Sequence, residues 1–173
     1  FNDLKDLENY PSQIEEDLVL LEKAGCDLVF SPQKTDIYPQ GYEVIQFNLN
    51  GLDHLMEGAH RPGHFDGVAT VVERLFTLIQ PDVAYFGQKD FQQLQIVSLL
   101  AESMGIRICS LPTVREQNGL AMSSRNLRLS TERREEAKLI YEILRWAKSN
   151  FSSHSIVDLK NMVIQKLSKT PVF

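Results

Sequence analysis

Apolar side chains recur at helical spacing along the middle of this chain, and short apolar runs separate the helical stretches. A helix is predicted over residues 68–80, whose apolar face consists of Val68, Val71, Val72, Leu75, Phe76 and Ile79. Pro81-Asp82 ends this pattern, and the apolar run Val83–Phe86 predicts a buried parallel strand. A helix from about Asp90 to Gly105 and a strand over Ile106–Leu111 follow. Because helix and strand alternate through short connections, the pattern predicts an α/β fold with a Rossmann-like, doubly wound parallel sheet.

Weaker patterns precede this region. Ser12 followed by Glu15 is a capping-box pattern, and it predicts a helix that ends at Gly25. The runs Leu28–Phe30 and Glu43–Leu49 predict two short strands. The first run is apolar throughout, as expected for a buried strand.

The composition changes after Pro112, where a polar, turn-prone segment begins. We therefore place a domain boundary there and divide the chain into domains 1–113 and 114–173. Ser130 and Ser155 are N-cap candidates for two helices of the second domain, the first ending near Ser149. The second domain is predicted to be the smaller one and of the α+β type.

The stretch from Phe86 to Gln93 has the composition of a strand, a glycine turn and the start of a helix. Gly87 would let the backbone turn or approach a ligand closely. Free N–H groups at a helix amino terminus attract anions, and Lys89 adds a mobile cation. Ligands of parallel sheets bind at the carboxyl ends of strands, where Gly87 lies. The alternative is an ordinary strand-to-helix turn with a solvated Lys89 and Asp90.

A second candidate stretch, Gly119–Asn126, contains two hydroxyl groups and an arginine after a run of small residues. Small side chains let main-chain N–H groups reach phosphate oxygens, and the fork of Arg125 can hold an anion at two points. The alternative is a surface loop that leads into a helix.

A third stretch, residues 51–67, is rich in glycine and holds three of the four histidines. His60 and His64 are four residues apart, but Pro62-Gly63 prevents a continuous helix between them. No further ligand cluster is present, so we expect no metal site. A structured surface loop is the alternative to a role in substrate binding.

Composition narrows the possible functions. The chain has 173 residues, a net charge of −5 and a pI near 5.4. An acidic chain is a poor candidate for binding nucleic acid or anionic membranes in general. Cys26 and Cys109 lie beside or within strand-like runs and are expected to be buried, reduced thiols, which favours a cytoplasmic location. No apolar run is long enough to span a bilayer.

Three segments together, Glu57–Phe65, Phe86–Gln93 and Met122–Asn126, resemble the pantothenate synthetase (pantoate–β-alanine ligase) family in order and spacing. The resemblance implies a Rossmann-like fold of the nucleotidyltransferase type. It also implies ATP-dependent ligation of (R)-pantoate and β-alanine to pantothenate through a pantoyl adenylate, with release of AMP and pyrophosphate. Mg²⁺ is expected with ATP, and the family suggests a cytoplasmic homodimer.

The resemblance also assigns roles to residues. Lys89 and Arg125 would be catalytic, because both steps concentrate negative charge. ATP would contact Gly87, Gln88, Lys89, Asp90, Val114, Met122, Ser123, Ser124 and Arg125. Pantoate or β-alanine would contact Gln93, Arg61 and His64. The second domain would close over the reacting groups as a lid.

The family pattern also opens with a His-x-Gly-His turn and an Asn-Pro-x-Gln-Phe segment, of which Phe1 would be the last residue. We therefore expect an internal fragment that lacks these segments and part of the carboxyl-terminal domain, and that is inactive alone. Two alternatives stay open: a related nucleotidyltransferase that only transfers AMP, and a non-catalytic fragment that binds nucleotide weakly or only self-associates.

Overall fold

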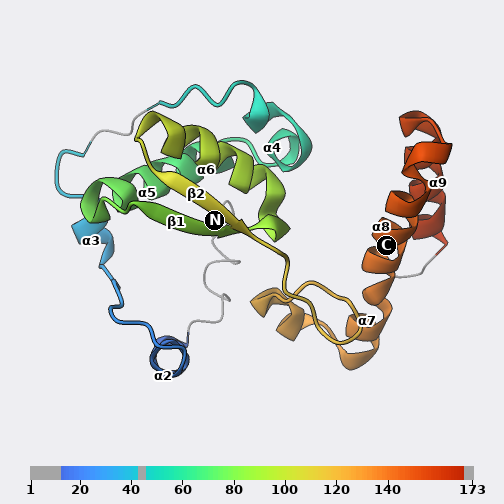
Figure 1. Ribbon diagram of the computed structural model, residues 1–173, viewed down its shortest axis with the longest axis horizontal. Helices are drawn as coiled ribbons and strands as arrows, with labels where there is room; N and C mark the ends of the chain where they lie inside the picture. The colour runs from blue at the N-terminus through green and yellow to red at the C-terminus, as the bar shows by residue number, and fades with distance from the viewer. Residues whose placement is uncertain (1–12, 43–45, 170–173) are drawn as a thin grey trace. The chain divides into compact units, whose positions relative to one another are not determined.

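Residues 13–42 and 46–169 are described by the computed structural model, and contacts within the chain divide it into two units (Figure 1). The first unit is Phe1–Pro112 and the second is Thr113–Phe173. The change in composition after Pro112 thus coincides with a change in packing. Ser12 and residues 43–45, which the sequence assigns to a helix cap and a strand, lie outside the described residues.

Two parallel strands form the sheet of the first unit. β1 (Val83–Gly87) pairs with β2 (Arg107–Leu111), and Val83 lies opposite Arg107. The chain passes from β1 to β2 through a 3₁₀ turn, η2 (Gln88–Asp90), and helix α6 (Phe91–Ser103). This is the strand–helix–strand unit that the alternating pattern predicted.

Helix α5 (His64–Ile79) precedes β1 and packs against α6. It starts four residues before the predicted start of this helix. Gln80 ends it in the left-handed conformation, with φ of 49°. Its apolar face is buried at Val72 and Phe76, but Ile79 is exposed, so spacing alone placed Ile79 wrongly in the core.

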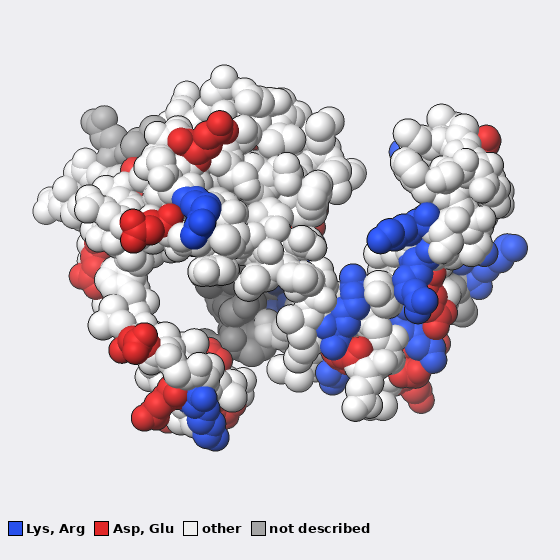
Figure 2. Space-filling model, in the orientation of Figure 1, with Lys and Arg blue, Asp and Glu red and all other residues white. Residues whose placement is uncertain are grey.

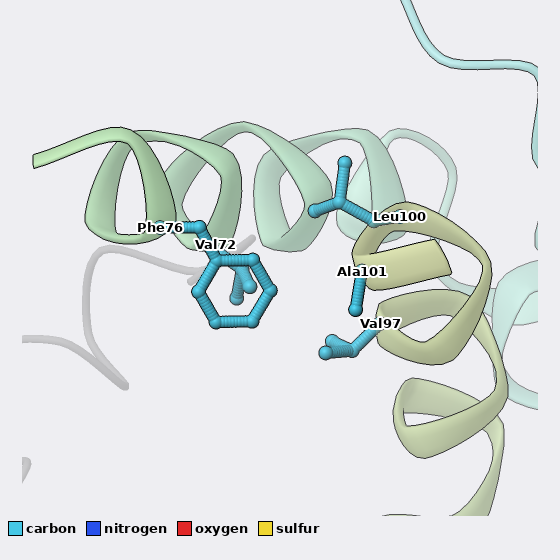
Figure 3. Close-up of a cluster of buried hydrophobic side chains, with 5 residues drawn as sticks. All are labelled: Val72, Phe76, Val97, Leu100 and Ala101. Atoms are coloured by element: carbon cyan, nitrogen blue, oxygen red, sulfur yellow. The ribbon is translucent and has the colours of Figure 1, made fainter. Parts of the chain in front are cut away.

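A hydrophobic cluster joins the two helices, and Figure 3 shows its five fully or nearly buried members: Val72, Phe76, Val97, Leu100 and Ala101. Ala84 and Phe86 of β1 and Ile108 of β2 pack against this cluster. Tyr85, which points to the opposite face of the strand, is 65% exposed. The helices therefore cover one face of the strand pair, as the two-residue period of a strand requires.

Shorter helices complete the first unit: α2 (Ile14–Lys23), α3 (Lys34–Ile37), η1 (Leu52–His54) and α4 (Met56–His60). The helix predicted before Gly25 is confirmed, and Gly25 follows its end with φ of 79°. The segment predicted as a glycine-rich loop is instead largely helical, since it holds η1, α4 and the start of α5.

The strand predicted at Leu28–Phe30 is absent, and residues 46–49 are not a strand either. Leu28 is 81% exposed, and the described residues provide no neighbouring strand for this segment. A strand requires a partner for its N–H and C=O groups, and an apolar run cannot supply one by itself. Cys26 is exposed rather than buried, and Cys109 is half-buried; both are free thiols.

The second unit is built from a hairpin-like turn and helices. In its described part, β structure is limited to the antiparallel bridge between Arg115 and Ala121. The helices are η3 (Ser124–Arg128), α7 (Thr131–Glu136), α8 (Lys138–Asn150), η4 (Phe151–Ser153) and α9 (Ile156–Ser168). α8 packs against α9, and Lys166 lies 4.3 Å from the centre of the Trp146 ring.

Local signals placed these helices well. The hydroxyl of Ser130 accepts a hydrogen bond from the N–H of Arg133, and that of Ser155 accepts one from Asp158. Both predicted caps are thereby confirmed. The helix predicted from residue 131 to about 149 is divided at Ala137, where the N–H of Ile140 bonds to the carbonyl three residues earlier.

Candidate functional site

Polar side chains follow β1 at the carboxyl end of the sheet. Gln88 donates from Nε2 to the Ser110 hydroxyl of β2 at 3.3 Å. Lys89 Nζ lies 3.8 Å from Asp90 Oδ1. Both side chains are partly exposed, and a cation is thus presented at the edge where parallel sheets bind ligands. The four predicted residues of this segment lie together because they are consecutive in the chain: Gly87, Gln88, Lys89 and Asp90.

Gly87 is extended rather than turned, with φ of −76°. Any residue can adopt this conformation, so the backbone here does not require glycine, and the predicted glycine turn is absent. A Cβ at this position would meet no atom within 4 Å. Neither backbone strain nor packing explains the glycine at this position. The open space beside its Cα would allow a ligand to approach the backbone closely.

The two adjacent glutamines that follow differ in environment. Gln93, the expected substrate contact, is half-buried. Gln92 is only 8% exposed, and its side-chain amide makes three hydrogen bonds with the segment from Leu52 to Glu57. Sequence reasoning gave Gln92 no role. Its spacing of four residues from Ile96, which is fully buried, is the signal that could have placed it inside.

Arg61 and His64 flank the gap between α4 and α5. Arg61 forms an ion pair with Glu57 at 3.1 Å, one helical turn earlier. His64 begins α5, and burial, followed by the nearby Arg61 cation, lowers its pKa below the ordinary 6.5. The imidazole is therefore mainly neutral at pH 7. His60 and His64 belong to different helices, as Pro62-Gly63 predicted.

No group of three or more metal-ligating side chains occurs among residues 13–42 and 46–169. In the same part of the chain, no helix has the length and apolar character needed to cross a membrane.

In the second unit, the candidate phosphate loop leaves a tight hairpin. The N–H of Met122 bonds to the carbonyl of Val114 at 3.0 Å, and the N–H of Glu116 bonds to that of Leu120 at 2.8 Å. Val114 and Met122 are 67% and 55% exposed. The Ser123 hydroxyl accepts from the N–H of Arg125 at 3.3 Å and so caps η3. Val114, Met122, Ser123, Ser124 and Arg125 are thus grouped at one end of this hairpin.

A carboxylate holds this loop in place. Glu116 accepts hydrogen bonds from Asn126 Nδ2 and from Arg134 Nε, both at 2.9 Å. Asn126 also donates to the carbonyl of Ala121 at 3.0 Å. The hydrogen bond from Arg134, followed by the one from Asn126, lowers the pKa of Glu116 below its ordinary value. The hairpin, the loop and α7 are therefore connected through one charged group.

The hairpin turn is also fixed on α8. The guanidinium of Arg115 lies 3.8 Å from the centre of the Tyr141 ring and donates to the carbonyl of Gly119 at 3.1 Å. Gly119 has φ of 92°, and a Cβ there would meet Tyr141 Cδ1 at 2.6 Å. Both the conformation and the close approach require glycine at this position.

Charge is distributed unequally between the two units. Residues 113–173 carry 11 Lys and Arg against 6 Asp and Glu, whereas residues 1–112 carry 7 against 17. On the face drawn in Figure 2, Lys and Arg side chains gather over the helices of the second unit. The net charge of −5 therefore conceals a cationic unit, which suits an anionic ligand.

Changing Glu116 to Gln is expected to make the stability of the second unit depend less on pH. Because the pKa of Glu116 in the folded protein lies below 4.5, its charge stabilises the fold above pH 4.5 and stops doing so as pH falls through the folded pKa. The melting temperature of E116Q should be lower than that of the unchanged protein at about pH 6, and the difference should shrink toward about pH 3.

Thermal unfolding of both proteins across this pH range measures the effect. E132Q, on the exposed surface of α7, is the matched control and should show no such convergence. A difference for E116Q that stays constant with pH would contradict the assignment.

The parallel strand–helix–strand unit, with polar groups at the carboxyl end of β1, defines an α/β protein of the nucleotidyltransferase-like class. The sequence profile of the pantoate-beta-alanine ligase family matches residues 1–172. The chain belongs to this family.

Individual relatives agree with the profile. The pantothenate synthetase of Bdellovibrio bacteriovorus is 43% identical over 166 residues, which are 95% of this chain and 66% of the relative. The crystal structure of pantothenate synthetase from Thermus thermophilus matches with a TM-score of 0.88 and 42% identity, over 96% of this chain and 61% of that one. The predicted fold class is confirmed by this match.

A third relative was crystallised with ligands. The pantoate-beta-alanine ligase of Francisella tularensis, complexed with beta-gamma ATP and β-alanine, matches with a TM-score of 0.79 and 36% identity, over 96% of this chain and 63% of that one. The chain thus spans less than two thirds of the length of each of these three relatives.

Proposed function

We propose that the protein joins pantoate to β-alanine at the expense of ATP. The observation that carries this proposal is the group Gly87–Asp90 at the carboxyl end of β1, where open space adjoins a cation, in a chain of the pantoate-beta-alanine ligase family. The beta-gamma ATP and β-alanine named for the Francisella tularensis relative support the choice of substrates.

The proposed reaction has two steps. A carboxylate oxygen of pantoate attacks the α-phosphorus of ATP, the bond from that phosphorus to the bridging oxygen breaks, and pyrophosphate leaves. The amine of β-alanine then attacks the acyl carbon of the pantoyl adenylate, loses a proton and displaces AMP. Both steps gather negative charge, so positioned cations and N–H donors lower their barriers.

Residues of the first unit are assigned as follows. Lys89 stabilises charge on the phosphates, Asp90 accepts hydrogen bonds from the ribose, and Gly87 and Gln88 approach the nucleotide. Gln93, with an amide that donates and accepts, binds pantoate. Arg61 and His64 bind a carboxylate substrate. The neutral imidazole favoured by the low pKa of His64 leaves Arg61 as the main cation of that pair.

Residues of the second unit are assigned to the same nucleotide. Val114 borders the adenine, and Met122, Ser123 and Ser124 contact the phosphates together with the catalytic Arg125. The cationic character of this unit supports the assignment. A lid role for this unit is part of the proposal. Mg²⁺ would accompany ATP, bound chiefly through phosphate oxygens as is usual for this ion. Assembly as a homodimer and a cytoplasmic location rest on the family resemblance.

The test is an assay of AMP release by the complete product of the gene, with ATP, pantoate and β-alanine omitted in turn. We expect AMP only when all three are present. AMP transfer to a single acceptor without ligation would instead support a nucleotidyltransferase. Absence of both free AMP and an AMP–acceptor product would refute both activities.

A further inference from the structure

Gln92 is a buried amide in the first turn of α6, directly before the proposed pantoate contact Gln93. Its carbonyl oxygen accepts from the N–H of Glu57 at 3.1 Å. Its amino group donates to the carbonyls of Leu52 and Leu55, at 2.5 Å and 2.8 Å. Both ends of the amide are thus used, and all three partners lie in one segment.

This segment contains backbone conformations that need support. Met56 has φ of 45°, in the left-handed region that side chains other than glycine rarely adopt. Two of the three hydrogen bonds of Gln92 reach Leu55 and Glu57, the residues on either side of Met56. Such a conformation persists only where its surroundings hold it, and the amide of Gln92 does so from both sides.

The segment leads directly to the proposed acid-substrate residues. Glu57, whose N–H is held by Gln92, pairs through its carboxylate with Arg61 at 3.1 Å. His64 begins the next helix three residues after Arg61. A displacement of the segment would therefore move Arg61, while Lys89 and the end of β1, which the three hydrogen bonds of Gln92 do not reach, would keep their places.

We propose that Gln92 is a positioning residue that sets the site of a carboxylate substrate by fixing residues 52–57, and that it acts without contacting substrate. The inference rests on the proposed function, because the substrate of Arg61 and His64 is part of that proposal. It extends that function by separating two neighbouring glutamines: Gln93 binds substrate, and Gln92 positions the segment of residues 52–57.

The test compares two variants of the complete gene product. Gln92→Leu keeps the approximate size and removes all three hydrogen bonds. Gln92→Glu keeps an acceptor for the Glu57 N–H but cannot donate while ionised. Gln95→Leu, on the exposed face of the same helix, is the control. Measurements are kcat, the KM of each substrate, and amide hydrogen exchange of residues 52–61.

For Gln92→Leu, we expect the KM of pantoate or β-alanine to rise about tenfold or more, the cost of one or two buried hydrogen bonds. The KM of ATP should change less than about twofold, because Lys89 is undisturbed. Exchange of the amides in residues 52–61 should accelerate. Loss of folded protein alone would instead lower the apparent kcat and leave the KM of all three substrates unchanged.

For Gln92→Glu, the defect should depend on pH. Protonation gives the carboxyl group one O–H donor beside its acceptor, which restores part of the amide's pattern. Burial favours that neutral form, so the KM defect relative to the unchanged protein should shrink as pH is lowered toward about 5. A role in packing alone predicts no such recovery.

The outcomes separate the two proposals. If the unchanged protein and Gln95→Leu release no AMP, the proposed function fails and the substrate role of Gln92 fails with it. If both are active and the Gln92 variants show unchanged KM values for pantoate and β-alanine, the positioning role alone is overturned. Unchanged hydrogen exchange in residues 52–61 would overturn it as well.

Discussion

Replacing Lys89 with Ala is expected to slow adenylate formation about a hundredfold or more, the effect of removing one preorganised charge from a developing anion. Lys89 lies in the 3₁₀ turn at the carboxyl end of β1, and 39% of its side chain is exposed. Its nearby partner is Asp90, at 3.8 Å, a distance that leaves the ammonium group able to engage phosphate oxygens. The rate of pantoate-dependent exchange between ATP and pyrophosphate measures this step.

The control for Lys89 is Lys160→Ala, which removes an exposed lysine from α9. We expect its exchange rate to equal that of the unchanged protein. The melting temperatures of both variants should stay close to the original, because neither side chain is buried. A K89A protein with an unchanged exchange rate would remove Lys89 from the proposed mechanism.

Replacing Gly58 with Ala is expected to destabilise the first unit by about 3 kcal/mol, at the upper end of the usual cost of overpacking. A Cβ at Gly58 would lie 2.1 Å from the carbonyl oxygen of Asp53 and 2.5 Å from its carbonyl carbon. Both are backbone atoms, so no side-chain rotation can relieve the clash. The same segment is held by Gln92, and its displacement should also weaken substrate binding.

Gly67→Ala is the matched control for Gly58, since the same substitution is made nine residues later within α5. A Cβ at Gly67 would meet no atom within 4 Å, and its backbone is helical. Alanine there should stabilise the protein by about 0.5–1 kcal/mol. Urea unfolding of both variants gives the two free energies. Similar values for the two substitutions would contradict the packing seen around Gly58.

Repeating patterns were sufficient to predict the central part of the fold. Helices α5 and α6 were predicted because their apolar residues recur at helical spacing. Strands β1 and β2 were predicted because each lies in a short run between two such helical or turn-prone stretches. The caps at Ser130 and Ser155 were predicted for a similar reason, since a cap bonds to an N–H only three residues away.

Motifs placed the candidate site less completely. Lys89 and Arg125 were predicted as site residues because their segments combine small residues with cations, and their roles stay a prediction. The Glu116 contact with Arg134, which holds the loop of Arg125, was not found, since the two charges are 18 residues apart and each resembles an ordinary surface charge. Gly87 was predicted to lie in a turn, but its backbone is extended and open space surrounds its Cα. A turn and a close approach by a ligand both favour glycine, so the sequence alone could not distinguish them.

Long-range partners account for the rest. The run Leu28–Phe30 is apolar enough for a buried strand, yet it is exposed, because a strand also needs a neighbour that its own residues do not specify. Gln92 is the opposite case: its polar side chain is buried because carbonyls and an N–H group 35 to 40 residues away receive it. Periodicity and capping depend on residues only a few positions apart, so they can be predicted from the sequence. Which distant groups satisfy a buried amide or complete a strand depends on packing, and only the folded protein reveals it.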